Sequence, residues 1–244
     1  MLDSLSILQL LLATLILVVA YVVRGITGFG SGLIAIPALA LLLPLGLVVP
    51  MVGLLDYIAS VSHGLKHRQA IAWREILPLL PFTFLGVVSG LYLFKTLDTE
   101  LLKRFLGGFV LLYALYSLAG KSPKGQGSRY WALPAGGCGG LIGTLFGTGG
   151  PFYVIYLHFR GLDKSSFRAT IATIFFIDGA SRIIGYTASG FYSMNVLVLV
   201  AAALPVMAVA LYAGGHIHTN ISSQGFQRAI SIILMCSGLA LILR

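Results

Sequence analysis

Long apolar runs separated by short polar loops fill this chain, and their lengths predict membrane-spanning helices. A helix crosses the bilayer core with about 20 consecutive apolar residues. Runs close to that length cover residues 5–23, 45–65, 76–94, 101–119, 167–188, 196–214 and 226–243. The pattern therefore predicts an all-α polytopic membrane protein.

Glycine interrupts the apolar pattern twice, in residues 24–32 and 143–150. The first interruption reads Arg-Gly-Ile-Thr-Gly-Phe-Gly-Ser-Gly, and the second reads Gly-Thr-Leu-Phe-Gly-Thr-Gly-Gly. The apolar limbs that follow, residues 33–43 and 152–159, are too short to cross a bilayer alone. Irregular backbone at this depth is tolerated only where protein or a water-filled cavity covers it. Each interruption predicts a broken helical hairpin, with two short crossings as the alternative, and paired breaks indicate a transporter's substrate site.

The two halves of the chain follow the same plan, which predicts an inverted repeat. Each half holds three full spans and one broken pair, so it crosses the membrane an odd number of times and the halves face opposite ways. The predicted fold is two inverted repeats, each a glycine-broken helical hairpin plus three transmembrane helices, in residues 1–119 and 131–244 with a cytoplasmic linker at 120–130. Matching residues keep their order at offsets of 124 (Pro81 and Pro205, Gly90 and Gly214, Arg104 and Arg228), 122 (Asp56 and Asp178) and 117 (Phe29, Gly30, Ser31 and Gly32 with Phe146, Gly147, Thr148 and Gly149).

Composition and charge support a membrane protein and predict its orientation. Hydrophobic residues make up 58% of the 244 positions and charged residues only 9%, against about 25% charged in soluble domains. The net charge of +9 comes from short loops and forms no basic patch of domain size, which argues against nucleic-acid binding. Loops rich in Lys and Arg stay in the cytoplasm, and this rule puts both termini outside. The cytoplasmic side would hold Lys66, Arg68, Arg74, Lys121, Lys124, Arg129, Arg160, Lys164, Arg168 and Arg228, and the other side Lys95, Lys103, Arg104 and Arg244.

The two glycine breaks are predicted to form an anion site. A helix that restarts after a break presents unpaired N–H groups and the positive end of its dipole. Glycine permits positive φ and close approach of a ligand to the backbone. With inverted halves, the two restarts could converge on one small ligand near the midplane. Tight helix packing is the alternative role for these glycines. The predicted substrate-binding residues are Arg24, Thr27, Gly28, Phe29, Gly30, Ser31, Gly32, Thr144, Phe146, Gly147, Thr148, Gly149, Gly150 and Arg182.

Asp56, Asp178 and Arg182 fall well inside predicted spans, where each ionised group costs about 3 kcal/mol. Asp178 and Arg182 are four residues apart and can pair on one helix face. Arg182 also offers a planar fork of donors to an oxyanion. The sequence places no basic residue within one helical turn of Asp56, so Asp56 and Asp178 are the candidates for coupling transport to a proton or sodium ion. A buried, protonated Asp56 and an Arg24 that extends to the headgroups are the alternatives.

The sequence offers no convincing catalytic or metal site. It contains no G-x-S-x-G elbow, no H-E-x-x-H pair and no P-loop. Cys138 and Cys236 lie in apolar segments without metal-ligand spacing. A non-enzymatic protein without cofactor or metal is therefore predicted.

The glycine run 25–32 followed by Pro37, the helix of Asp56 and the second break ending at Pro151 resemble the TauE/SafE family of sulfite and organosulfonate exporters. The resemblance covers nearly the whole chain. It implies a multi-pass secondary transporter of the inner cell membrane that exports a small anion by alternating access, with sulfite or an organosulfonate favoured as cargo. An anion channel, a permease for small carboxylates and a subunit of a membrane complex are the alternatives. The choice of anion, the coupling ion, the direction of net flux and homo-oligomerisation stay open.

Overall fold

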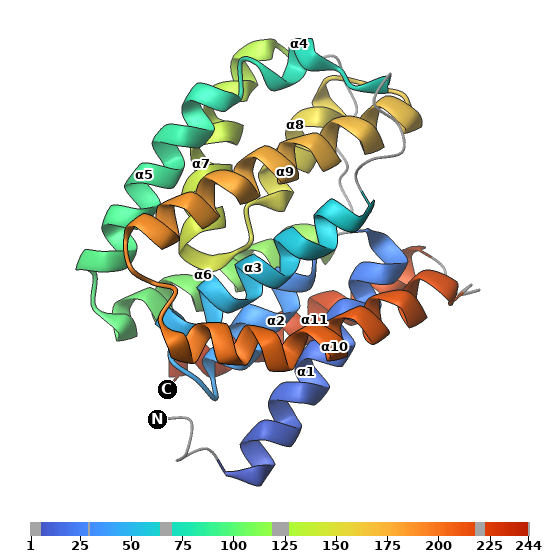
Figure 1. Cartoon of the computed structure of the whole chain (residues 1–244). Coiled ribbons are helices and arrows are strands. Elements are labelled where there is room, and N and C mark those ends of the chain that lie inside the picture. The colour runs from blue at the N-terminus through green and yellow to red at the C-terminus, as the bar shows by residue number, and fades with distance from the viewer. Residues whose placement is uncertain (1–5, 29, 64–69, 119–126, 218–222, 244) are drawn as a thin grey trace. The chain divides into compact units, whose positions relative to one another are not determined.

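The computed structural model describes residues 6–28, 30–63, 70–118, 127–217 and 223–243 (Figure 1). All regular elements in these ranges are helical, which confirms the all-α prediction. Three helices, α1, α6 and α10, are long and apolar enough to cross a membrane. The elements are α1 (Ile7–Thr27), α2 (Ser31–Ala40), α3 (Leu45–His63), α4 (Trp73–Ile76), α5 (Leu80–Thr96), α6 (Thr99–Leu118), η3 (Arg129–Trp131), α7 (Ala132–Phe146), α8 (Gly150–Phe159), α9 (Lys164–Ala188), α10 (Met194–His216) and α11 (Ser223–Leu243).

The helix boundaries agree with the apolar runs except at two places. The first predicted break is shorter than expected, because α1 continues through Arg24 and Gly25 to Thr27. The predicted span at residues 76–94 divides into the short helix α4 and the helix α5, which begins one residue before Pro81. A proline is tolerated there because the first turn of a helix has no use for its missing N–H. Phe29, most of the predicted linker, and Lys66, Arg68, Lys121, Lys124 and Arg244 lie outside the described residues.

The chain forms two compact units, and each takes helices from both halves of the sequence. Unit 1 comprises Met1–Leu55, Leu97–Lys121 and Phe191–Arg244, and unit 2 comprises Asp56–Thr96 and Ser122–Gly190. In unit 1, α1 packs on α10 and α6 packs on α11. In unit 2, α5 packs on α7, and α9 packs on α5 and α8. The units therefore cut across the two predicted repeats.

Glycines bring the backbones of α5 and α7 into close contact within unit 2. A methyl group at Gly86 would overlap the Gly137 carbonyl and lie 2.7 Å from Leu141 N. A methyl group at Gly140 would overlap the Thr83 carbonyl. The hydrophobic effect does not drive helix association within lipid, so close van der Waals packing between small residues stabilises such interfaces. Gly86 and Gly140, which lie outside the two breaks, therefore serve tight helix packing.

Gly140→Ala is expected to lower the stability of the purified protein, whereas Gly137→Ala on the same helix is not. A methyl at Gly140 would lie 3.1 Å from Val87 N as well as against the Thr83 carbonyl, and overpacking of this kind costs about 1–3 kcal/mol. A methyl at Gly137 meets nothing within 4 Å. Gly137→Ala should therefore keep its gain in helix propensity of about 1 kcal/mol, with no packing cost against it. Thermal unfolding in detergent compares the variants. Equal midpoints would contradict the close α5–α7 contact.

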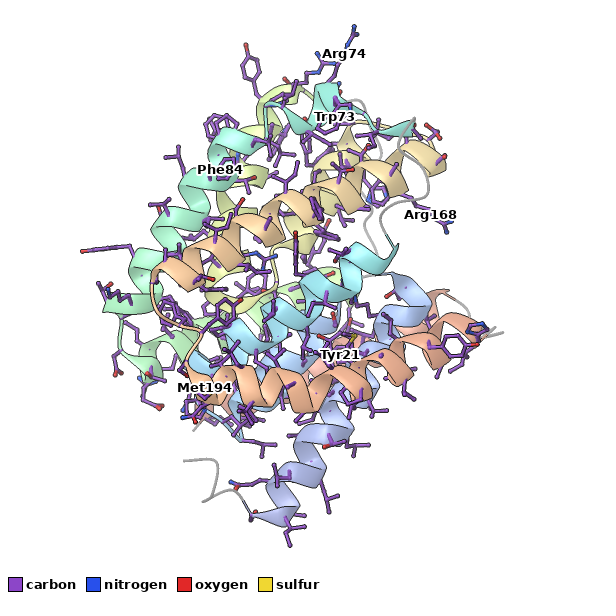
Figure 2. The ribbon with its side chains drawn as sticks, in the orientation of Figure 1. Tyr21, Trp73, Arg74, Phe84, Arg168 and Met194 are labelled. Carbon is purple, nitrogen blue, oxygen red and sulfur yellow. The ribbon has the colours of Figure 1, made fainter. Side chains whose placement is uncertain are left out.

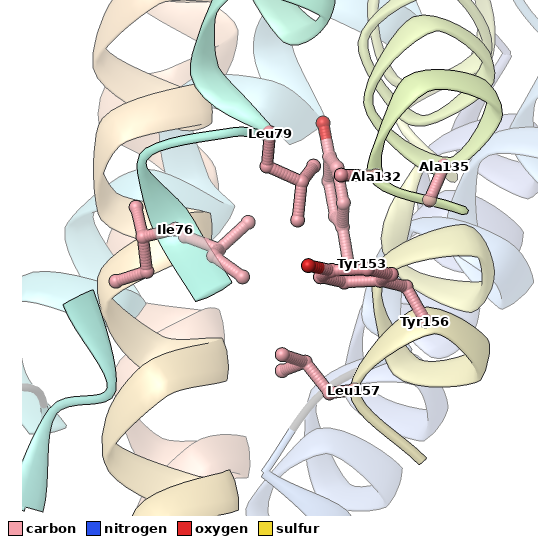
Figure 3. Close-up of a cluster of buried hydrophobic side chains, with 8 residues drawn as sticks. Ile76, Leu79, Ala132, Ala135, Tyr153, Tyr156 and Leu157 are labelled. Atoms are coloured by element: carbon pink, nitrogen blue, oxygen red, sulfur yellow. The ribbon is translucent and has the colours of Figure 1, made fainter. Parts of the chain in front are cut away.

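A cluster of buried apolar side chains holds α4, α7, α8 and α9 together in unit 2 (Figure 3). Ile76 and Leu79 come from α4 and the turn after it, and both are almost completely buried. Close packing of such side chains stabilises the contact through many small dispersion interactions. The cluster thereby fixes the broken helix α8 against its neighbours. Its members are Ile76, Leu79, Ala132, Ala135, Tyr153, Tyr156, Leu157 and Ile174.

Candidate functional site

The second glycine break is a sharp turn that leaves the start of α8 without a side-chain cap. Gly147 ends α7 at φ 64°, in the left-handed region that favours glycine, and its N–H donates to the Gly143 carbonyl at 2.8 Å. Helix α8 then begins at Gly150, and the N-cap residue Gly149 makes no side-chain hydrogen bond. The positive end of the α8 dipole therefore lies at the break without a side-chain partner.

The first break, in unit 1, is built in the same way. Gly28 ends α1 at φ 86° and donates to the Arg24 carbonyl at 2.6 Å. Gly30, at φ 94°, precedes Ser31, the first residue of α2, again without a side-chain cap. The equivalent helix ends, Gly28 and Gly147, are 119 residues apart, and so are the helix starts at Ser31 and Gly150. At the offset of 117 that the sequence predicts, Gly30 pairs with Gly147, and both of these glycines are also left-handed.

Arg182 brings a positive charge from α9 to the second break. Its Nη2 forms an ion pair with Asp178 Oδ2 at 2.8 Å, and its Nη1 donates to the Gly143 carbonyl at 2.8 Å. The side chain of Arg182 is 15% exposed and that of Asp178 is 1% exposed. The Gly143 carbonyl therefore accepts both the Gly147 N–H and the guanidinium. This double contact ties α9 to the last turn of α7.

Buried polar atoms without a hydrogen-bond partner gather around this ion pair. They are Thr148 Oγ1, Tyr153 OH, both carboxylate oxygens of Asp178, and Arg182 Nε. The charges of Asp178 and Arg182 both act on the Tyr153 hydroxyl. Native proteins leave few buried polar groups unpaired, so this group of atoms marks a place where a polar ligand would be stabilised.

Two of the four predicted hydroxyl groups are already committed to their own helices. Thr27 and Thr144 each donate to the carbonyl four residues earlier, Val23 and Gly140, at 2.8 Å. This local bond competes with any other use of the hydroxyl proton. The Thr144 carbonyl in turn accepts the Tyr186 hydroxyl. Thr148 is therefore the predicted hydroxyl donor whose oxygen is buried and unpaired at the second break.

Arg24 is buried and turns towards the start of α2. Its Nη1 donates to Ser31 Oγ at 2.8 Å, and the residue is only 8% exposed. The structure therefore brings together Arg24 and Ser31, and the alternative of an arginine that extends to the headgroups does not hold. Gly32 is buried in the first turn of α2, and Phe146 is buried at the end of α7.

Asp56 and Asp178, the two acidic residues predicted for coupling, both act on one arginine in unit 2. Asp178 contacts Arg182 directly, and the charge of Asp56 also reaches the Arg182 guanidinium. Asp56 is half-buried in α3, and its carbonyl accepts the Ser60 hydroxyl at 2.8 Å. The spacing of residues could not indicate the interaction of Asp56 with Arg182, because the two residues lie on different helices.

A second charged cluster, centred on Glu75, was missed by the sequence analysis. The Glu75 carboxylate accepts from Arg160 Nε at 2.7 Å, from the Tyr156 hydroxyl at 2.9 Å and from Arg129 Nη2 at 3.2 Å. Burial alone would raise the pKa of Glu75, but the hydrogen bonds from Arg160 and Tyr156, with the charges of Arg160 and Arg129, hold its pKa below the ordinary value. The partners are 54 to 85 residues away in sequence, so no local pattern signals them.

Apolar helices, two glycine breaks and a buried arginine beside one of them are typical of a membrane transporter. The family model for the sulfite exporter TauE/SafE matches residues 13–241, and the chain belongs to this family. The chain is 26% identical over 198 residues to the probable inner membrane transporter protein TsaS of Comamonas testosteroni. The matched region covers 80% of this chain and 81% of that relative. It is also 26% identical over 230 residues to the probable sulfite/organosulfonate exporter TauE of Cupriavidus necator, at 90% and 88% coverage. No solved structure matches the chain.

Proposed function

We propose that the protein is a secondary transporter that exports a small anion, sulfite or an organosulfonate, across the inner cell membrane by alternating access. Membership of the TauE/SafE family supports the transport role. The relative from Cupriavidus necator is named a probable sulfite/organosulfonate exporter, which favours a sulfur oxyanion as cargo.

The observation that carries the proposal is the group of unpaired buried polar atoms at the second break. Thr148 Oγ1 and Arg182 Nε are donors without an acceptor, next to the uncapped start of α8. A sulfonate or sulfite group supplies acceptor oxygens that would satisfy them together. A guanidinium binds such oxyanions through its fork of N–H groups. In this proposal Arg182 and Thr148 hold the anionic head, and the positive end of the α8 dipole adds to the attraction.

Alternating access would use the inverted repeat, for which the helix contacts give independent support. In unit 2, Gly90 of α5 packs against Thr144 of α7, and in unit 1, Gly214 of α10 packs against Gly25 of α1. Gly90 and Gly214 are 124 residues apart, and Gly25 and Thr144 are 119 apart, which are the offsets of the corresponding repeat elements. The two contacts are thus equivalent under the predicted symmetry. Convergence of the two breaks on one ligand stays a prediction of the sequence.

Coupling and orientation complete the proposal. Asp178 and Asp56 would carry the coupling ion, a proton or sodium, because both act on the substrate-binding arginine. The side that holds Arg129 and Arg160 would be cytoplasmic, and both termini would be outside. The shared contact of these two arginines with Glu75 supports their assignment to one side.

Thermal unfolding of the purified protein with a panel of small anions tests the substrate class. The panel holds sulfite, sulfate, sulfoacetate, taurine, short sulfonates and carboxylates of matched length. A ligand that binds the folded state raises the unfolding midpoint by mass action. We expect a rise with sulfite or sulfonates. A rise with carboxylates alone would overturn the assignment of sulfur oxyanions, and no rise with any anion up to high concentration would contradict the binding site.

A further inference from the structure

Two short helical turns in unit 2, α4 and η3, present exposed tryptophan, tyrosine and arginine side chains. Figure 2 shows Trp73 and Arg74 at the outer end of α4, with Arg74 extended away from the helices. Trp73 is 49% exposed, Trp131 is 51% exposed and Tyr130 is 89% exposed. Glu75 joins the two turns because it lies on α4 and binds Arg129 of η3. We refer to Trp73, Arg74, Arg129, Tyr130 and Trp131 as the α4–η3 surface.

The α4–η3 surface carries excess positive charge. Glu75 is buried and is shared between Arg129 and Arg160, so it neutralises only one of them. Within the described residues Arg74 is exposed and has no ion pair. The bonds to Glu75 use Nε and Nη2 of Arg129, whose side chain is still 53% exposed. Guanidinium donors of two arginines are therefore available to an anion from the outside.

Contacts beneath the surface hold it in place. Ile76 and Leu79 anchor α4 in the apolar cluster of Figure 3. The Trp131 ring stacks on Phe159 with centroids 5.5 Å apart, and Arg160 donates to the Gly127 carbonyl just before η3. Groups fixed in this way lose little conformational entropy when a ligand binds.

We propose that the α4–η3 surface binds the phosphate head group of an anionic glycerophospholipid. Tryptophan and tyrosine concentrate at the membrane interface, where phospholipid head groups lie. Arginine is suited to phosphate, and basic pockets beside the cytoplasmic ends of membrane helices bind anionic head groups. Arg74 and Arg129 would contact the phosphate, and the two indole rings would flank the glycerol region. This site is separate from the anion centre at Arg182 and does not depend on the transported substrate.

Fluorescence quenching by brominated lipids tests the proposal directly, because Trp73 and Trp131 are the two tryptophans in the whole sequence. The full protein is reconstituted in phosphatidylcholine vesicles that contain either brominated phosphatidylglycerol or brominated phosphatidylcholine at the same fraction. Preferential binding of the anionic lipid places its bromines beside both reporters. We expect stronger quenching by the brominated phosphatidylglycerol, with a preference of about fivefold for each arginine. Equal quenching by the two lipids would overturn the proposal.

Two variants and one control test whether the preference for the anionic lipid depends on the α4–η3 surface. Arg74→Gln is expected to lower the lipid preference about fivefold, and Arg74→Gln with Arg129→Gln about 25-fold. Arg74→Gln leaves every Glu75 contact in place, so its result is independent of any effect of Arg129 on folding. The control, Lys95→Gln with Arg104→Gln, removes two exposed cations on α5 and α6 and should leave quenching unchanged. A preference that survives in the arginine variants, or that is lost equally in the control, would show that the bound lipid is not held by this surface.

Discussion

Replacing Arg182 with glutamine is expected to abolish the rise in unfolding midpoint that sulfite or sulfonates produce in the wild-type protein. The substitution removes the buried positive charge at the second break, together with the unpaired Nε donor. Hydrogen bonds to charged groups contribute about 1.5–3 kcal/mol, so affinity should fall by about 10- to 100-fold. Thermal unfolding over a range of anion concentrations measures the change.

Arg182→Lys separates the loss of binding from a loss of folding. Lysine keeps a positive charge opposite Asp178 but lacks the fork that contacts Asp178, Gly143 and the proposed anion at once. We expect Arg182→Lys to fold and to bind the anion about tenfold more weakly. Arg168→Gln, an exposed position on the same helix α9, should bind as tightly as the wild type. Wild-type affinity in both Arg182 variants would remove this residue from the site.

Glu75→Gln is expected to destabilise unit 2 by about 2–3 kcal/mol. The change leaves Arg160 and Arg129 without the carboxylate that they share. The side chain of Arg160 is only 19% exposed. Breaking a buried ion pair by removing one partner costs about 3–5 kcal/mol. We expect the smaller loss of about 2–3 kcal/mol because the Arg129 side chain is half exposed and water can hydrate it after the change. Thermal unfolding at neutral pH measures the loss, and Glu100→Gln, whose ion pair with Lys103 is exposed, is the control with an expected change near zero.

The same cluster predicts a dependence of stability on pH. The pKa of Glu75 in the folded protein lies below its ordinary value, so the unfolded chain binds more protons in the interval between the two values. The stabilisation by Glu75 is complete above its unfolded pKa of about 4.3. It disappears as the pH falls through the lower, folded-state pKa. The difference in midpoint between wild type and Glu75→Gln should therefore shrink in acid, and a difference that grows in acid would contradict this role of the carboxylate.

The sequence predicted the helices well because the length of an apolar run is a local property. It placed the two helix breaks because clustered glycines inside an apolar run end a helix at the position where they occur. It missed the start of α5 at Leu80, since residues 76–79 are as apolar as the helix but belong to α4 and the turn that anchors it in a buried cluster. The sequence also did not show that α1 continues through Arg24 and Gly25 to Thr27.

The site was predictable in part. The pairing of Asp178 with Arg182 followed from their spacing on one helix, and the structure bears it out. The contact of Arg182 with the Gly143 carbonyl did not follow, because it joins residues 39 apart. Nor could the sequence show that Thr144 donates its proton within its own helix while Thr148 is left unpaired. These outcomes depend on how helices pack, which residue spacing does not record.

Counterflow in proteoliposomes tests the central claim of saturable anion transport most directly. Vesicles with the purified protein are loaded with an unlabelled organosulfonate, and entry of the labelled compound is followed with the membrane potential clamped. We expect uptake that saturates with concentration, that is accelerated by substrate on the opposite side and that is strongly reduced in Arg182→Lys. Flux that rises linearly with concentration and ignores the opposite side would identify a channel. That result would contradict alternating access.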